Sequence, residues 1–185
     1  MVFCKGGKKI LNTNFVINGE QIEVVKKYPY LGIVFSNTGS LKGAIETLKQ
    51  KAMKAAFSLK SSLASQNICS PALFMRLFDK LIKPILLYGC EVWAQEILRL
   101  KKITLTKLNK FPPEQIHIKL CKWALGLRKS TNNNATRAEL GRYPIYIDII
   151  KQTQNYSSRF EQLPDERIVK KAYLNENQIK RRHMV

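Results

Sequence analysis

Acidic residues are scarce in this sequence. Thirteen Asp and Glu stand against 32 Lys and Arg, which gives a formal net charge of +19. The excess is spread along the chain: +7 over residues 1–60 (10 basic, 3 acidic), +5 over 61–110 (8 and 3) and +7 over 111–185 (14 and 7). A compact chain this basic repels itself, and a partner with a long phosphate track relieves the repulsion better than a point ligand does. A basic surface without such a partner is the alternative.

Residues for metal or phosphate chemistry are also few. The three aspartates, Asp79, Asp148 and Asp165, are isolated in sequence, whereas a two-metal phosphoryl-transfer site needs clustered carboxylates. No Gly-rich phosphate loop is present, because "KGGKK" has the wrong spacing. His117 and Cys121 lie four residues apart but lack two further ligand candidates, so a packed pair is expected. The sequence therefore predicts no catalytic residues, no metal ligands and no cofactor in this chain.

Cysteine pairs and long apolar runs are missing too. Four cysteines lie far apart without a Cys-x-x-Cys motif, which favours reduced thiols in an intracellular compartment, nuclear or cytoplasmic. The opening "MVFCKGGKK" lacks the pattern of a signal peptide. The most apolar stretch, "PILLYGC", is far shorter than the roughly 20 residues that span a bilayer. No membrane partner is expected.

The first 35 residues are typical of β-structure. "NFVI" and "QIEVV" flank "NGE", and Asn-Gly between β-prone runs predicts a hairpin. "YPYLGIVF" predicts a further strand, with Pro29 at an edge or strand start, and Met1 to Cys4 predicts another. In an extended strand Tyr28 and Tyr30 share one face. That face is either a stacking platform or half of a core.

After Ser40 the hydrophobic period becomes helical. A long basic amphipathic helix follows, with Lys42, Lys49, Lys54 and Lys60 off its apolar stripe. Ser70 and Pro71 open a second helix with a kink expected near Pro84, and Pro112 and Pro113 open a third. "KSTNNNAT" is expected to be a loop, "RAELG" a short helix, and residues 145–160 and 165–174 further helices. Phe57 and Trp123, each near lysines, either stack on bases or pack in a core.

These elements predict an α+β fold, in which a short N-terminal antiparallel sheet precedes a mainly α-helical region. The expected divisions are a β segment at 1–38, a helical region at 39–110, a helical extension at 111–175 and a basic tail at 176–185. The charge and the interleaved aromatic residues favour nucleic acid as the partner. Oligomeric state is not indicated by any pattern in the chain.

Several segments together resemble one protein family. "GEQIEVVKKYPYLGIVFSNTGS", "LFDKLIKPILLYGCEVWA", "HIKLCKWALGL" and "ELGRYPI" are similar, in order and spacing, to the C-terminal part of non-LTR (LINE-type) retrotransposon reverse transcriptases. The resemblance covers Met1 to about Gln154. It implies that 1–38 is a palm edge with the primer-grip hairpin at Tyr28, Tyr30, Leu31 and Gly32, followed by a thumb-like region.

The resemblance also implies what the chain lacks. In that family the fingers and the palm, with the aspartates that bind Mg²⁺, precede the matching segment, so this chain is not expected to be an active RNA-directed DNA polymerase alone. It is expected to bind template-primer nucleic acid, an RNA–DNA hybrid or duplex, through the grip-like residues and Lys42, Lys49, Lys54 and Lys60. The alternatives are a co-opted or decayed helical protein-interaction module with no nucleic-acid role, and a polymerase assembled with a separate palm.

Overall fold

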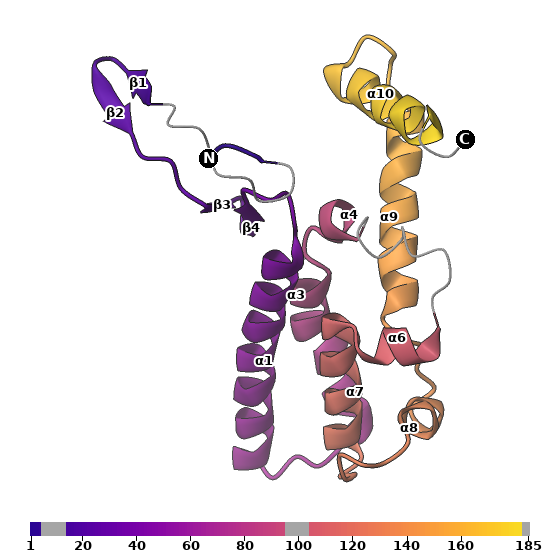
Figure 1. The fold of residues 1–185 in the computed structure, drawn as a ribbon. Coiled ribbons are helices and arrows are strands. Elements are labelled where there is room, and N and C mark those ends of the chain that lie inside the picture. The colour runs from indigo at the N-terminus through magenta and orange to yellow at the C-terminus, as the bar shows by residue number, and fades with distance from the viewer. Residues whose placement is uncertain (5–13, 95–103, 183–185) are drawn as a thin grey trace.

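The computed structural model describes residues 1–4, 14–94 and 104–182, and it confirms an α+β fold with two small antiparallel sheets ahead of a helical body (Figure 1). The strands are β1 (Phe15–Ile17), β2 (Glu20–Ile22), β3 (Lys27–Tyr30) and β4 (Ile33–Ser36). The helices are α1 (Lys42–Ser65), α2 (Pro71–Leu77), the π-helical η2 (Phe78–Ile82), α3 (Lys83–Leu87), α4 (Cys90–Trp93), α6 (Leu105–Asn109), α7 (Pro112–Ala124), α8 (Asn133–Glu139), α9 (Tyr146–Glu161) and α10 (Ile168–Arg182). None of the helices so described is long and apolar enough to cross a membrane.

The predicted Asn-Gly hairpin is confirmed as β1–β2. Asn18 and Gly19 both have positive φ, 51° and 84°, as a two-residue turn between right-twisted strands requires. The strands are shorter than the sequence predicts, and all six of their residues are exposed. Figure 1 shows why: this hairpin stands away from the helical body, so packing does not extend it.

The prediction of a single strand for "YPYLGIVF" is wrong, because the segment is a second hairpin. β3 and β4 pair in antiparallel register, with Leu31 and Gly32 as the turn at φ 46° and 79°. Glycine tolerates this region without cost, and it is the sequence signal that a strand assignment overlooked. Met1 to Cys4 forms no strand; the Cys4 N–H donates to the Asn37 carbonyl at 2.8 Å.

The long amphipathic helix is confirmed as α1, and its predicted stripe is buried or packed against the core. The buried members are Ala44, Ile45, Leu48, Ala52 and Ala56. The Ser70 side chain accepts from the Leu73 N–H and Pro71 opens α2, as predicted. The irregularity expected at Pro84 is the π-helical turn η2 just before it, where the Lys83 N–H donates to the Phe78 carbonyl five residues back.

The main hydrophobic core lies between α1, α2, η2, α3 and α7. Its buried members include Ala52, Ala56, Phe78, Ile82, Leu86, Ile116, Leu120 and Ile145. The core thus contains residues from both the expected helical region, 39–110, and the expected helical extension, 111–175. A second cluster surrounds the fully buried Trp93 and joins α1 and α4 to α9 through Ile45, Leu48 and Ile149.

The C-terminal helices differ from expectation mainly at their starts. Helix α8 begins at Asn133, inside the segment expected to be a loop, because the Asn132 side chain accepts from the N–H groups of Asn134 and Ala135 and caps it. Helix α9 confirms the helix predicted over 145–160. Helix α10 begins three residues later than predicted, runs on past the expected boundary at 176, and crosses the end of α9 (Figure 1).

Gly89 holds the β3–β4 hairpin against the helices, so its substitution should be costly. Its φ is +62°, and a Cβ built there would lie 2.5 Å from Cδ1 of the buried Ile33. We expect Gly89→Ala to lower the free energy of unfolding by about 1 to 3 kcal/mol, because backbone strain and the displacement of Ile33 add. Urea denaturation followed by circular dichroism measures the loss.

The matched control is Gly43→Ala, a glycine within α1 whose added Cβ would meet no atom within 4 Å. Alanine is favoured over glycine by about 1 kcal/mol in a helix interior and by less in the first turn, where Gly43 lies, so this variant should be at least as stable as the parent chain. If the two variants had the same free energy of unfolding, the left-handed backbone at Gly89 and its close approach to Ile33 would not contribute to stability.

Candidate nucleic-acid interface

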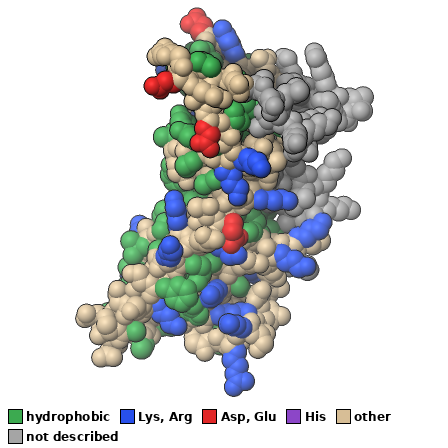
Figure 2. All heavy atoms as spheres, turned by 60° about the vertical axis from the view of Figure 1, so that its left-hand side comes forward, with side chains coloured by type: hydrophobic (Ala, Val, Ile, Leu, Met, Phe, Trp, Pro, Cys, Tyr) green, Lys and Arg blue, Asp and Glu red, His purple; other side chains and the backbone are tan. Residues whose placement is uncertain are grey.

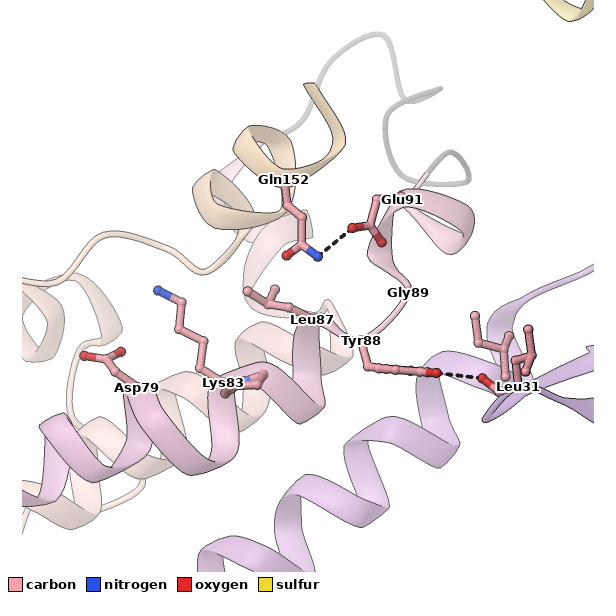
Figure 3. Close-up of a pocket in the computed structure, with 10 residues that line it drawn as sticks. Leu31, Asp79, Lys83, Leu87, Tyr88, Gly89, Glu91 and Gln152 are labelled. Atoms are coloured by element: carbon pink, nitrogen blue, oxygen red, sulfur yellow. Dashed lines mark hydrogen bonds between the residues drawn. The ribbon is translucent and has the colours of Figure 1, made fainter. Parts of the chain in front are cut away.

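The grip-like residues lie on the surface of the β3–β4 hairpin. The exposed fractions of Tyr28, Tyr30 and Leu31 are 52%, 59% and 72%, and Gly32 is exposed as well. Of the two alternatives for the tyrosine face, the structure therefore has an exposed face rather than half of a core. The tip is anchored to the helical body, since the Tyr88 hydroxyl donates to the Leu31 carbonyl at 2.8 Å (Figure 3).

A pocket of about 710 Å³ lies between this hairpin tip, η2, α3, α4 and α9 (Figure 3). Its wall holds the carboxylates of Asp79 and Glu91. Glu91 accepts from the Gln152 amide at 2.7 Å, and Asp79 receives a bidentate pair of hydrogen bonds from Arg142 at 2.7 and 2.6 Å. The hydrogen bond to Asp79 also raises the pKa of Arg142. Lys83, which also lines the pocket, pairs with Asp148 at 2.7 Å, so the charged groups in this wall already have partners within the chain.

The four lysines proposed on α1 do not share one face. At 3.6 residues per turn, Lys42, Lys49 and Lys60 lie within about 20° of one line, and Lys54 lies about 120° from it. Lys42, Lys54 and Lys60 are exposed, whereas Lys49 is half-buried and forms an ion pair with Glu46 at 3.2 Å. The structure thus groups Lys42, Lys49 and Lys60 and separates Lys54 from them.

Lys60, at the end of the row formed by Lys42, Lys49 and Lys60 on α1, lies beside helix α7 in a cluster of aromatic and basic side chains. The Phe57 and Trp123 ring centroids are 5.1 Å apart at an interplanar angle of 55°. The Lys60 ammonium lies 4.6 Å from the Trp123 ring, and the Lys119 ammonium lies 5.1 Å from that ring and 5.5 Å from Phe57. We call these four residues the α1–α7 cluster.

Charge and exposure both distinguish this cluster. Phe57 is 54% exposed, so part of its ring is accessible to a ligand, whereas Trp123 is half-buried. Among the described side chains, no Asp or Glu forms an ion pair with Lys60 or Lys119. Figure 2 shows the face on which α1 lies, where blue Lys and Arg side chains are scattered and red acidic ones are few. Uncompensated cations beside an aromatic pair with one exposed ring suit nucleic acid.

Small residues on α1 explain how the cluster forms. Ala52 and Ala56 are fully buried where α7 packs with Ile116 and Leu120, and side chains this small let the two helices approach closely. The residues that flank this contact are consequently brought together at its edge. Lys119 was not among the residues predicted from the sequence, although its position four residues before Trp123 on the same helix was an available signal.

His117 and two of the four cysteines, Cys90 and Cys121, are buried. Cys121 lies in the main core, His117 stacks on Phe78 at 5.4 Å, and the described residues contain no group of three or more His, Cys, Asp or Glu that could hold a metal. Burial raises the pKa of Cys121 to about 12, and burial with the nearby Glu91 charge does the same for Cys90. Cys69, in contrast, is exposed.

No protein-family model, curated protein or solved structure matches this chain. The similarity to LINE-type reverse transcriptases therefore stays a prediction from the quoted segments. The α1–α7 cluster and the β3–β4 hairpin are the candidate site on their geometry alone.

Proposed function

We propose that this chain binds template-primer nucleic acid, an RNA–DNA hybrid or duplex, through the α1–α7 cluster and the lysines aligned with it on α1. The observation that carries the proposal is the Phe57–Trp123 pair, with Phe57 exposed and Trp123 half-buried, flanked by Lys60 and Lys119 without acidic partners. Stacking of one base on an aromatic ring contributes about 1 to 3 kcal/mol, and neutralised phosphates add a strongly salt-dependent term.

The β3–β4 hairpin is the second part of the proposed surface. Its exposed Tyr28 and Tyr30, with Leu31 and Gly32 at the turn, correspond by resemblance to a primer grip of a LINE-type reverse transcriptase. In this proposal the chain has no catalytic turnover of its own, and Mg²⁺ belongs to a palm outside it. The proposal places the chain in the nucleus or cytoplasm, which its free cysteines Cys4, Cys69, Cys90 and Cys121 support.

The proposal is tested by the salt dependence of binding to a fluorescently labelled RNA–DNA hybrid. We expect the double substitution Lys60→Glu and Lys119→Glu to weaken binding at least tenfold at fixed salt and to reduce the slope of log affinity against log salt by about 2, because two phosphate contacts are lost. Fluorescence anisotropy over a series of salt concentrations measures both quantities.

The matched control is Lys54→Glu with Lys151→Glu. This pair changes the net charge by the same amount, but Lys54 lies off the α1 line and Lys151 lies on α9, and both side chains are exposed. We expect it to change the slope by less than half as much. An affinity that is flat between low and physiological salt would refute the proposal and favour the protein-interaction alternative. Equal losses in the two variants would mean that binding follows diffuse charge rather than this cluster.

A further inference from the structure

The Trp123 ring separates two small pockets. One, of about 320 Å³, lies at the end of α1 and the start of α2 and is walled chiefly by Leu63, Ile68 and Phe74, with Lys60 at its edge. We call it the Trp123 pocket. The other, of about 280 Å³, is lined by Lys119, Lys122 and Lys129 with Ile118 and Leu127, and we call it the lysine pocket. The first offers apolar walls and an aromatic ring, and the second offers positive charge.

Both pockets lack acidic walls, which sets them apart from the larger one at the hairpin tip. None of the residues lining the Trp123 pocket or the lysine pocket is Asp or Glu, whereas Asp79 and Glu91 line the larger pocket. A polyanion is repelled by carboxylates and attracted to uncompensated ammonium groups. Charge complementarity therefore favours the two pockets beside Trp123, rather than the larger pocket, as the place where a polyanion binds.

Lys60 and Lys119 can each exchange a contact with the Trp123 ring for a contact with a phosphate. Lys60 lines the Trp123 pocket and Lys119 lines the lysine pocket, and in the free chain both ammonium groups lie over the Trp123 ring. A cation over an aromatic ring at an exposed site gains only about 0.5 to 1 kcal/mol. Neither lysine is paired with a described acidic side chain, so a phosphate can draw each away and leave the ring to a base.

We propose that the Trp123 pocket takes one unpaired base of the bound nucleic acid, while the phosphates beside that base contact Lys60 and Lys119. The inference rests on the proposed function and deepens it, because it names the form of nucleic acid that this site selects. A base paired within a duplex has both faces covered by its neighbours, and even the terminal pair of a blunt end presents a whole base pair rather than a single base to the ring. An unpaired base can stack on Trp123 and bury its apolar face against Leu63 and Phe74.

The test compares a blunt RNA–DNA hybrid with the same hybrid carrying a single-stranded extension. We expect the extended hybrid to bind at least fivefold tighter and to quench tryptophan emission, whereas the blunt hybrid leaves emission unchanged. The chain has two tryptophans, and Trp93 is fully buried, so the quenching reports Trp123. Trp123→Leu should abolish the difference between the two ligands. The matched control, Tyr143→Leu, removes an aromatic ring that is 77% exposed and should preserve the difference.

A thiol measurement tests the pocket without altering Trp123. Cys69 lines the pocket and is exposed, whereas Cys90 and Cys121 are buried. In a Cys4→Ser variant, labelling by a maleimide therefore follows Cys69. We expect the extended hybrid to slow this labelling at least threefold and the blunt hybrid to leave its rate unchanged.

The outcomes separate this inference from the proposed function. Equal, salt-dependent affinities for the two hybrids, with no quenching and no protection of Cys69, would overturn the unpaired-base pocket and leave the proposed function standing. Salt-independent binding, or no binding of either hybrid, would overturn both. Protection of Cys69 together with quenching by the extended hybrid alone would support the inference, and an RNA or a DNA extension then shows which strand supplies the base.

Discussion

Arg137→Met is expected to lower the free energy of unfolding by about 3 to 5 kcal/mol, because it leaves the buried Glu114 carboxylate without its charged partner. Glu114 is fully buried, and its Oε1 accepts from Arg137 Nη1 at 2.7 Å. Its Oε2 accepts from the Ile145 N–H at 2.7 Å. These contacts tie α7 to α8 and to the start of α9. Urea denaturation of the full chain measures the loss.

His117 is another ionisable side chain that lies beside Glu114 among the described residues. His117 Nδ1 lies 3.5 Å from Glu114 Oε1, which is longer than a charge-assisted hydrogen bond, and it has no hydrogen-bond partner among the described atoms. Methionine approximates the length of the arginine side chain and limits the cavity that the substitution leaves. The predicted loss is therefore chiefly the cost of an unpaired charge rather than of lost volume.

Two controls separate these contributions. Arg142→Met breaks a bidentate pair with Asp79, but the side chains of that pair are 20% and 36% exposed, so water compensates and a loss of about 1 kcal/mol is expected. Adding Glu114→Gln to Arg137→Met removes the buried charge and should restore part of the stability, while the glutamine carbonyl can still accept from the Ile145 N–H. A loss below 1 kcal/mol for Arg137→Met alone would contradict the assigned role of the pair.

Local signals in the sequence were sufficient for several elements of the fold. The α1 stripe, the Ser70 cap with Pro71, and the Asn18–Gly19 turn each depend on residues close together in the chain. The residue pattern alone missed the Leu31–Gly32 turn, because the β-prone residues around it favour one continuous strand and because Leu31 has a positive φ of 46° that leucine rarely adopts. The Tyr88 hydroxyl, 57 residues away, holds that turn through the Leu31 carbonyl.

The candidate site was less predictable than the fold, because it depends on which helices meet. Periodicity placed the lysines off the apolar stripe of α1, but it could not indicate that α7 packs along the side that carries Lys60 rather than the side of Lys54. The partnership of Phe57 with Trp123 spans 66 positions and requires that packing. The Glu114–Arg137 pair is likewise non-local, and neither residue is marked by a motif.

Trp93→Ala is the second substitution with a large expected effect, a loss of about 3 to 5 kcal/mol in the free energy of unfolding. Trp93 is fully buried with Ile45, Leu48 and Ile149, so truncation removes contacts that join α1, α4 and α9 and leaves a cavity. Its Nε1–H also donates to the Tyr88 carbonyl at 2.9 Å. Urea denaturation and hydrogen exchange of the full chain measure the global and local consequences.

The bond from Trp93 to Tyr88 connects this core to the β3–β4 hairpin. Tyr88 in turn holds the hairpin tip at Leu31, so loss of Trp93 should also increase hydrogen exchange in β3 and β4. Trp93→Phe keeps most of the buried ring but leaves the Tyr88 carbonyl without this donor, and a smaller loss of about 1 to 3 kcal/mol in the free energy of unfolding is expected.

Tyr88→Phe isolates the hairpin contact, because it removes only the hydroxyl that reaches Leu31. If Trp93→Ala destabilised the chain while exchange in β3 and β4 stayed unchanged, the hairpin would be held by Gly89 and Ile33 instead.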